Sequence, residues 1–374
     1  METKSPRVAD VHYADMRTKE GSSLLDKTRR IFAKAGLDTC VAEGDLVAIK
    51  LHWGEVGNLA YLAPPLVRVV VEEVKKRGAK PFLTDANTLY RGGRRNAIDH
   101  ILTAYKNGFT MGTVDAPVII ADGLKGLDYQ VIEGKGRHFR TLKIGSAIHN
   151  ADALIVLSHF KGHLLMGFGG AIKNLGMGCA SPAGKQAMHS DLRPKVKQSL
   201  CIGCGTCEAH CPAKAVRVME DGKAVVQQRL CIGCGECTAV CPTEAIPIRW
   251  KTDEQAVQEK TAEYALAALE GKQNKCGFIN FLIRVSPDCD CFGWNDTSFV
   301  PDIGILGSKD PVAIDQASAD LVNQAPGMPN SKLGNNLEAA DKIQKVTGVN
   351  WESTLRYGEE LGLGTRAYRI IKVD

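Results

Sequence analysis

The sequence predicts an α/β fold: a mostly parallel, helix-covered sheet, in one large lobe or two small ones, with a small domain inserted into it. Short β-branched runs alternate with longer amphipathic runs before residue 195, and this alternation resumes after residue 250. The stretch between them is rich in cysteine and interrupts the pattern. We therefore divide the chain into a first α/β segment (1–194), an insert (195–250) and a second α/β segment (251–374).

The first α/β segment contains four predicted strands separated by longer connections, which favours a parallel sheet covered by helices. The helix predicted at 63–80 is entered by prolines and closed by Gly78, and the helix predicted at 94–108 ends at a glycine. A further helix is predicted at 143–151. The predicted strands are 45–53, 81–85, 117–122 and 151–159.

The second α/β segment repeats this pattern. "DEQAVQEKTAEYALAALEGK" (253–272) predicts a helix, "GFINFLIRV" (277–285) predicts a strand, and "DIGILGSKDPVAIDQASADLV" (302–322) predicts another β-α unit. Residues 331–374 are mixed and charged and contain no motif that indicates a function. Because the insert divides the α/β sequence, we expect the host domain to be discontinuous.

The insert contains one cysteine motif twice. "CIGCGTCEAHCP" (201–212) is followed by "CIGCGECTAVCP" (231–242), and each copy has the bacterial ferredoxin spacing C-x2-C-x2-C-x3-C-P. In this arrangement three thiolates of one run and the fourth of the other hold each [4Fe–4S] cluster. We therefore predict a ferredoxin-like α+β domain with two clusters. The predicted ligands are Cys201, Cys204, Cys207 and Cys241 for the first cluster, and Cys231, Cys234, Cys237 and Cys211 for the second.

Zinc is the alternative metal for these eight cysteines. A zinc site uses two separated ligand pairs around one tetrahedron, whereas two tight quartets suit two cubanes. Residues 1–20 contain no apolar run of signal-peptide length, and no run approaches the ~20 apolar residues that span a bilayer. We therefore expect a cytoplasmic protein without a membrane span. Its reducing surroundings disfavour disulfides, and exposed cubanes indicate an anaerobe.

The composition is that of a globular protein, with 374 residues, 44% hydrophobic and 24% charged. The formal net charge of +5 is weak for this length, and the aromatic residues form no basic-aromatic stripe. Nucleic acid is therefore not an expected partner. The expected partner is a redox protein or a small-molecule substrate.

Ligand-type side chains follow several predicted strands. In open α/β sheets, ligands bind outside the carboxyl ends of the strands, so these loops should meet at one rim. The loops expected there follow the strands that end near residues 53, 85, 159, 285 and 306. Their candidate side chains are His52, Glu55, Asp85, Arg91, Arg94, Arg95, His159, Lys161, His163, Lys173, Cys179, Cys289 and Cys291.

"GFGGAIKN" (167–174) is a candidate anion site, although it does not match the dinucleotide fingerprint. Small residues that lead into a helix expose backbone N–H groups to an anion, and Lys173 adds a positive charge. A tight turn with a solvated lysine is the alternative. The candidate anion-binding residues are Gly167, Gly169, Gly170, Arg94 and Arg95.

Four of the nine histidines, His52, His159, His163 and His189, lie at or near the predicted rim. Each alone is more often a structural residue than a catalytic one. Together they favour function, because a histidine near its unperturbed pKa moves protons at neutral pH or binds a metal.

Cys289 and Cys291 in "PDCDC" are candidate metal or redox residues. They are two apart, so both thiols face one side of an extended backbone. The flanking Asp288 and Asp290 are expected to raise the thiol pKa values unless a cation is bound. Two inert thiols are the alternative.

The segments "GFGGAIKNLGMGC", "SPDCDCFGWND" and "PDIGILGSKDPVAIDQA", together with the inserted cysteine pair, resemble the domain of unknown function 362 family of iron–sulfur proteins. The resemblance covers roughly residues 45–320. It implies the architecture and the clusters, and no particular reaction.

The glycine-rich segment is also distantly similar to that of the nickel-pincer lactate racemase family. His163, Lys173 and His189 occupy comparable positions. The resemblance implies that Lys173 carries a covalent pincer cofactor, that His189 ligates nickel and that His163 is an acid/base. "KNLGMG" departs from the proline-containing segment of that family, and a redox-neutral racemase needs no cluster insert. The likeness nominates these three residues as catalytic, beside an additional metal or small-molecule cofactor of unknown identity.

Three functions follow in order of preference. The first is an oxidoreductase whose clusters exchange electrons with a substrate or second cofactor at the rim, where His163 is the acid/base and Lys173 holds an anionic group. The second is a non-enzymatic electron carrier or docking protein, which predicts a shallow rim without buried ligand-type residues. The third is a metal-dependent isomerase or transferase, which predicts a bound non-iron metal or a modified Lys173.

Overall fold

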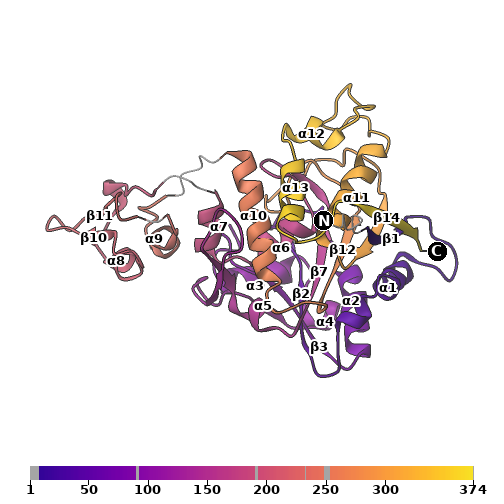
Figure 1. Cartoon of the computed structure of the whole chain (residues 1–374), viewed down its shortest axis with the longest axis horizontal. Coiled ribbons are helices and arrows are strands. Elements are labelled where there is room, and N and C mark those ends of the chain that lie inside the picture. The colour runs from indigo at the N-terminus through magenta and orange to yellow at the C-terminus, as the bar shows by residue number, and fades with distance from the viewer. Residues whose placement is uncertain (1–7, 90–91, 190–192, 232, 248–252, 374) are drawn as a thin grey trace, which may run out of the picture.

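The computed structural model describes residues 8–89, 92–189, 193–231, 233–247 and 253–373. A large α/β lobe carries a smaller lobe at one side (Figure 1). The large lobe is built on one eight-stranded sheet of order β14-β1-β13-β12-β7-β2-β3-β4, which confirms the predicted fold class. Its strands are β1 (Ala9–Asp15), β2 (Leu46–Lys50), β3 (Lys80–Asp85), β4 (Val118–Ile120), β7 (Ala153–His159), β12 (Cys276–Leu282), β13 (Gly304–Ser308) and β14 (Tyr368–Lys372).

One strand of this sheet, β13, runs against its neighbours. It pairs antiparallel with β1 and β12, whereas the other pairings among the described strands of the sheet are parallel. The loop after β13 therefore lies at the opposite edge of the sheet from the loops after β2, β3, β7 and β12. There Lys309 Nζ donates to Thr39 Oγ1 at 2.6 Å. The prediction that this loop joins the rim is wrong, because strand direction is not visible in an apolar run.

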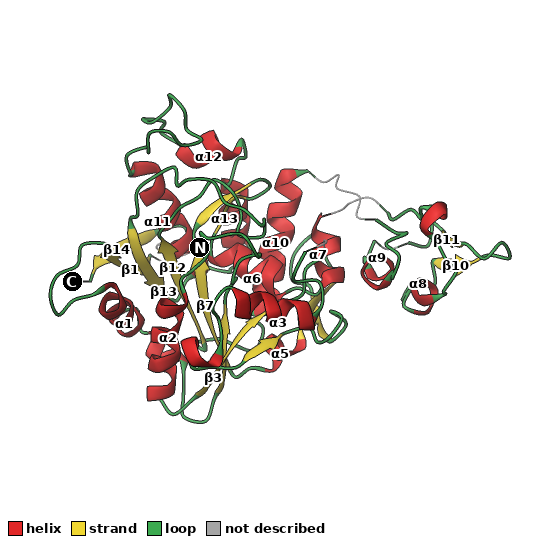
Figure 2. Cartoon of the chain, turned by 180° about the vertical axis from the view of Figure 1, so that it is seen from behind, coloured by secondary structure: helices red, strands yellow, loops and turns green. Residues whose placement is uncertain are grey.

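Helices cover both faces of the sheet because the buried strands are apolar on both sides (Figure 2). In β2, Val47 and Ile49 face one core, and Ala48 faces the other. The first core is closed by α1 (Leu24–Lys34), α2 (Pro64–Lys76), α3 (Ala97–Lys106) and α4 (Met111–Val114). The second core is closed by α6 (Ala171–Cys179), α10 (Glu254–Ala268), α11 (Pro311–Gln324), α12 (Lys342–Thr347) and α13 (Glu352–Glu360).

Small elements depart from the sequence prediction. Residues 143–145 are the end of a strand, β6 (Thr141–Gly145), which pairs antiparallel with β5 (Tyr129–Glu133), and the predicted helix is limited to α5 (Ser146–Asn150). The pairing with β5 could not be predicted from residues 143–151 alone. A second small hairpin joins β8 (Lys161–His163) to β9 (Gly167–Gly169), and a 3-10 turn η1 (Leu37–Cys40) precedes β2.

The small lobe lies in the chain between α7 (Pro182–His189) and α10. Its two halves repeat one another in structure as well as in sequence. Gly205 and Gly235 have φ angles of 75° and 76° and lead into α8 (Thr206–Ala209) and α9 (Glu236–Val240). The lobe also contains η2 (Gln198–Leu200) and an antiparallel pair of β10 (Val216–Val218) with β11 (Ala224–Val226).

Replacement of Gly176 by alanine is expected to destabilise the large lobe by about 1–3 kcal/mol, because overpacking a tight interface forces backbone movement. Gly176 lies where α6 crosses α10, and a Cβ there would meet the backbone oxygen of Thr261. Urea unfolding measures the change. Gly112→Ala in α4 is the matched control, since the nearest atom would be 3.9 Å away. Equal unfolding free energies for the two variants would contradict the packing.

Candidate functional site

The loops at the carboxyl ends of β2, β3, β7 and β12 surround a cavity of about 560 Å³. Strand-end residues from four separate parts of the chain therefore meet as predicted. Among the predicted rim residues, its lining contains His52, Glu55, Asp85, Arg94, His159, Lys161, His163, Gly170, Lys173, His189 and Cys291. It also contains Lys50, Ser158, Asn174 and Lys185, which were not predicted.

Two of the cavity cations are paired with carboxylates of the protein. Lys50 Nζ lies 2.9 Å from Asp85 Oδ1 and donates to Asn174 Oδ1 at 2.6 Å. Arg94 Nε donates to Glu55 Oε2 at 3.3 Å. Burial opposes ionisation of Asp85, yet Lys50 and other nearby positive groups hold the pKa of that carboxyl below its usual range. These two cations are therefore already neutralised by the protein.

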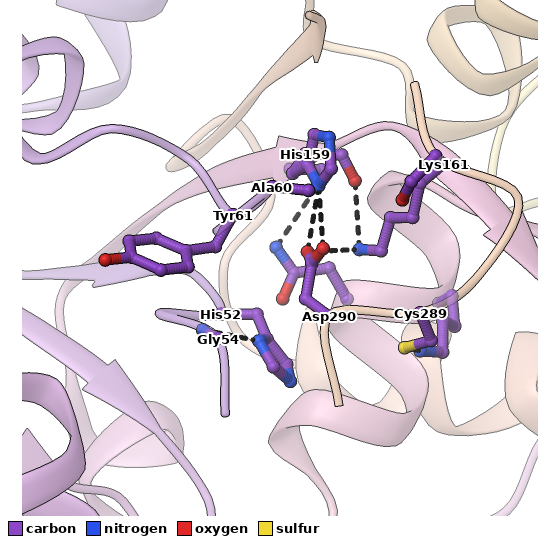
Figure 3. Close-up of polar contacts among 12 residues, drawn as sticks. His52, Gly54, Ala60, Tyr61, His159, Lys161, Cys289 and Asp290 are labelled. Atoms are coloured by element: carbon purple, nitrogen blue, oxygen red, sulfur yellow. Dashed lines mark hydrogen bonds and ion pairs between the residues drawn. The ribbon is translucent and has the colours of Figure 1, made fainter. Parts of the chain in front are cut away.

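A second charged group joins β7 to the loop after β12. His159 Nδ1 lies 2.9 Å from the Asp290 carboxylate, and Lys161 Nζ lies 3.2 Å from Asp290 Oδ2. Figure 3 shows Asp290 pointing toward both of these side chains, with Cys289 beside them on the same loop. Asp288 lies 3.7 Å from Lys332. The two aspartates thus face partners other than the neighbouring thiols.

Lys173 on α6 faces Cys289. Its Nζ donates to Cys289 Sγ at 3.1 Å. Hydrogen bonding from Cys291 outweighs burial, and with Lys173 and His163 it holds the pKa of Cys289 well below its usual value. For Cys289 the sequence predicted the opposite, because it placed Asp288 and Asp290 beside the thiols, and the two carboxylates point to other partners. The predicted direction holds for Cys291, whose pKa is raised by its hydrogen bond with Cys289 and by burial.

Three of the cavity histidines, His52, His163 and His189, are uncharged at neutral pH. Burial and the Lys173 ammonium lower the pKa of His163 to about 4. Burial lowers the pKa of His189 and of His52 to about 3, helped by His163 and by Arg94 respectively. His163 Nδ1 accepts from Leu165 N at 3.2 Å, so the ring proton sits on Nε2. The expectation of histidines near their unperturbed pKa is wrong for these three.

The predicted anion site is filled by the protein itself. Asp315 on α11 accepts hydrogen bonds from Ala171 N at 2.7 Å and Ile172 N at 2.9 Å. These are the first N–H groups of α6, which have no acceptor within the helix itself. A Cβ on Gly170 would meet this carboxylate. Arg95 pairs with Glu244 of the small lobe. Of the predicted anion-binding residues, Gly167 and Gly169 form β9 and do not line the cavity, while Gly170 and Arg94 do.

His52 makes the protein sensitive to acid. In the unfolded chain a histidine takes a proton near pH 6.5, but in the folded protein the pKa of His52 is about 3. Between these values the unfolded state binds more protons, so the free energy of unfolding falls as pH falls. We expect His52→Gln to reduce the loss between pH 7 and pH 5 by about 1–2 kcal/mol. Urea titrations at both pH values measure the free energy of unfolding. An equal loss of stability in the wild type and in His52→Gln would contradict the expectation.

Helix α7 lies between the cavity and the small lobe. Lys185 and His189 line the cavity. On another side of the helix, a Cβ on Gly235 would lie 2.5 Å from Gln186 Cβ and 3.0 Å from Ala183 O. Burial lowers the pKa of Lys185 to about 8, and its ammonium donates to Ala180 O at 2.6 Å. One helix therefore contacts both the cavity and the second cysteine motif.

The eight motif cysteines gather around two small hollows in the small lobe. The first hollow is lined by Cys201, Cys204, Cys207 and Cys241. The second hollow is lined by Cys211, Cys231, Cys234 and Cys237. Each set contains three cysteines of one run and the last cysteine of the other, the grouping that the spacing predicts.

Backbone N–H groups point at several of these sulfurs. Ala215 N donates to Cys211 Sγ at 3.1 Å, and Ala245 N donates to Cys241 Sγ at 3.2 Å, in corresponding positions of the two halves. Ala224 N donates to Cys201 Sγ at 3.3 Å. Within the described residues no three His, Cys, Asp or Glu side chains converge closely enough to hold a single metal ion.

The predicted rim residue Cys179 does not line the cavity. It is buried at the end of α6, and burial raises the pKa of its thiol to about 11. Arg91 lies outside the described residues. Lys50 was missed, although a lysine inside the apolar run "LVAIKL" is a signal of a buried charge. Asp315 was missed because no residue near it in the sequence indicates what it binds.

The fold and cavity define an α/β protein with a polar site at the carboxyl ends of a mostly parallel sheet. The chain belongs to the family described as "Domain of unknown function (DUF362)", whose match covers residues 47–320. This membership confirms the family resemblance seen in the sequence.

Two solved structures are similar to this chain. One is the lactate racemase apoprotein from Thermoanaerobacterium thermosaccharolyticum, with 14% identity and a TM-score of 0.37 over 75% of this chain and 52% of that one. The other is a protein from Thermotoga maritima, with 9% identity and a TM-score of 0.37 over 69% of this chain and 49% of that one. The aligned part of this chain thus spans about half the length of each.

No curated protein matches the chain in sequence. Among the described residues, none of the helices combines the length and the apolar character needed to cross a membrane.

Proposed function

We propose that this protein is an iron–sulfur oxidoreductase, in which two [4Fe–4S] clusters in the small lobe exchange electrons with a small molecule or second cofactor in the cavity of the large lobe. The observation that carries the proposal is the position of α7, which contacts the second cysteine motif at Gly235 and lines the cavity with Lys185 and His189. The small lobe, which we propose carries the clusters, and the substrate-sized cavity are thus both in contact with this one helix.

The donor sets of the two hollows fit cubane clusters. Each hollow offers four thiols, and N–H groups donate to the sulfurs of Cys201, Cys211 and Cys241. Such hydrogen bonds stabilise bound thiolates and tune cluster potentials. When bound, the clusters would supply one-electron transfer. The eight cysteines would hold them in the two sets given above.

The cavity residues have separate tasks. Lys173 stabilises negative charge on Cys289, and His163 holds a proton on Nε2 beside the same sulfur. Lys185 is a buried amine that can gain or lose a proton at mildly alkaline pH, because burial lowers its pKa to about 8. The Lys50–Asp85 and Arg94–Glu55 pairs hold the cavity wall in place.

The depth of the cavity disfavours the carrier alternative. A docking protein was expected to have a shallow rim without buried ligand-type residues, whereas Lys161 and His163 are each only 6% exposed and line a cavity of about 560 Å³. The metal-dependent isomerase or transferase stays the alternative, and it predicts a non-iron metal or a covalent addition on Lys173.

Anaerobic purification followed by metal analysis and intact mass measurement tests the proposal. We expect about eight iron atoms per chain, in agreement with two [4Fe–4S] clusters. The reduced protein should then be reoxidised by a small-molecule fraction of the source cell. Lys173→Ala should keep the iron but lose most of this reoxidation, because the lysine contacts Cys289 beside the cavity and not the clusters.

Three results would overturn the proposal. A protein that takes up little iron even after anaerobic reconstitution would remove the clusters. Reoxidation by the protein fraction alone, unaffected by Lys173→Ala, would support a carrier. Stoichiometric nickel or zinc, or a mass added to Lys173, would support the isomerase or transferase.

A further inference from the structure

Two thiols lie together in the cavity wall, in the turn that follows β12. Phe292 N donates to Cys289 O at 3.1 Å, which closes the turn and brings Cys291 back toward Cys289. Cys289 and Cys291 are thus the first and third residues of one turn, and their interaction lowers the pKa of Cys289 and raises that of Cys291. Cys289 is 1% exposed, whereas Cys291 lines the cavity. One sulfur is therefore buried and the other faces the space where a ligand would lie.

The buried sulfur has a dedicated cation. Lys161 is paired with Asp290, while Lys173 Nζ donates to Cys289 Sγ at 3.1 Å. A buried ammonium stabilises an adjacent thiolate, because both charges would otherwise lose the solvation of water without compensation. The surroundings thus favour negative charge on Cys289 over negative charge on Cys291.

We propose that Cys289 and Cys291 form a reversible disulfide that is the two-electron centre of the cavity, and that the substrate is a small thiol or its disulfide. The inference rests on the proposed function, because the two clusters are the one-electron partners of this couple. It adds the reacting atoms and the chemical class of the substrate.

The geometry assigns a role to each sulfur. In the disulfide form, Cys291 Sγ faces the cavity, and a substrate thiolate attacks it there. The Cys289–Cys291 bond breaks, a bond between the substrate sulfur and Cys291 forms, and the electron pair leaves on Cys289, beside Lys173. Exchange is faster when the leaving thiolate is the more stable one. Cys289 is therefore the leaving group and Cys291 the point of attack.

A second substrate thiolate completes the cycle. It attacks the substrate sulfur held on Cys291, forms the product disulfide and releases Cys291 as a thiolate. In sum, two substrate thiols lose two electrons and two protons, and the protein disulfide becomes a dithiol. Return to the disulfide removes two electrons and two protons from the pair. The clusters, when bound, would accept the two electrons one at a time, and the protons leave through the cavity. The same steps in reverse reduce a disulfide substrate.

The cavity connects the dithiol with the helix that contacts the small lobe. Cys291 and His163 line it together with Lys185 and His189 of α7. The same helix contacts Gly235 through Ala183 and Gln186, next to a cysteine of the second hollow. The cavity that Cys291 lines and the second hollow are therefore both neighbours of α7.

A redox series on the anaerobic wild-type protein tests the inference directly. Samples are equilibrated in mixtures of reduced and oxidised dithiothreitol, quenched in acid, unfolded, alkylated and analysed by peptide mass. We expect the peptide with Cys289 and Cys291 to change, along a two-electron curve, from a form with two alkylated thiols to an unalkylated disulfide that is two hydrogens lighter than the free dithiol. Cys40 Sγ donates to Cys276 O at 3.2 Å, so Cys40 and Cys276 are a matched neighbouring pair, and they should stay alkylated throughout.

Iron measured on the same samples separates this inference from the proposed function. Two thiols that stay free throughout, in a protein that holds its iron, would overturn the disulfide and keep the clusters. A pair that links in a protein that cannot hold iron would overturn the proposed function and keep the disulfide. A zinc or nickel ion that bridges the two sulfurs in the native mass would overturn the disulfide in favour of a metal site.

The roles of the two sulfurs are tested with glutathione disulfide as the probe. In Cys289→Ser the resolving thiol is gone, so Cys291 should accumulate one glutathione per chain. In Cys291→Ser the remaining thiol is buried and should accumulate at least tenfold less. Equal labelling of the two variants, or preferential labelling of Cys289, would overturn the assignment of Cys291 as the point of attack.

Discussion

Replacement of Cys241 by alanine is expected to remove about four of about eight iron atoms per chain, although Cys241 belongs to the second cysteine run. The structure places Cys241 in the first hollow, beside Cys204. Metal analysis of anaerobically purified protein measures the loss. Cys276→Ala is the control, because Cys276 is a half-buried residue at the start of β12 that lines neither hollow.

Double replacements show whether the ligands cross between the runs. Replacing two cysteines of the same cluster should remove no more iron than replacing one of them. Replacing one cysteine of each cluster should remove the iron of both. Cys204→Ala with Cys241→Ala should therefore keep about four irons, and Cys234→Ala with Cys241→Ala should keep almost none. The reverse result would mean that each run binds its own cluster, against the grouping of the two hollows.

Replacement of Asp315 by alanine is expected to destabilise the large lobe by about 3–5 kcal/mol, since three buried donors would lose a charged acceptor. Asp315 is fully buried and accepts from Ala171 N, from Ile172 N and, at 2.8 Å, from Asn280 Nδ2. It therefore ties α11 and β12 to the start of the helix that carries Lys173. Urea unfolding of the two proteins at neutral pH measures the difference.

Two further variants make the Asp315 result specific. Asp315→Asn keeps one acceptor oxygen and should lose less stability than Asp315→Ala. Gln324→Ala, at the exposed end of the same helix, should change the free energy of unfolding by no more than about 0.5 kcal/mol. A loss below about 1 kcal/mol for Asp315→Ala would show that α6 is held by other contacts.

The parts of the fold that follow from local pattern were predictable. Parallel strands place their carboxyl ends at one edge, and so His52, Asp85 and His163 could be placed together from the sequence. The direction of β13 could not be predicted, because the sequence of an apolar strand does not indicate which neighbour it pairs with. The loop at Lys309 was misplaced for that reason.

The chemistry of the site was harder to predict because its partners are distant in sequence. The acceptor for the start of α6 lies 144 residues away from Ala171, so a glycine-rich turn resembled an open anion site when it was already occupied. The pKa of Cys289 depends on Lys173, 116 residues away, more than on the adjacent Asp290. Sequence neighbours in a turn need not be neighbours of the side chain.

The two halves of the small lobe have nearly the same sequence but different surroundings. Cys204 of the first hollow is exposed, whereas Glu236, beside the second hollow, is buried and accepts from Tyr129 Oη of the large lobe at 2.6 Å. Solvent exposure and nearby charge set the reduction potential of a cluster. With clusters bound, these unequal settings would give an outer and an inner electron-transfer site. The direction of electron flow would then depend on where each copy lies against the large lobe and on the carboxylate of Glu236, whose counterpart in the first copy is Thr206.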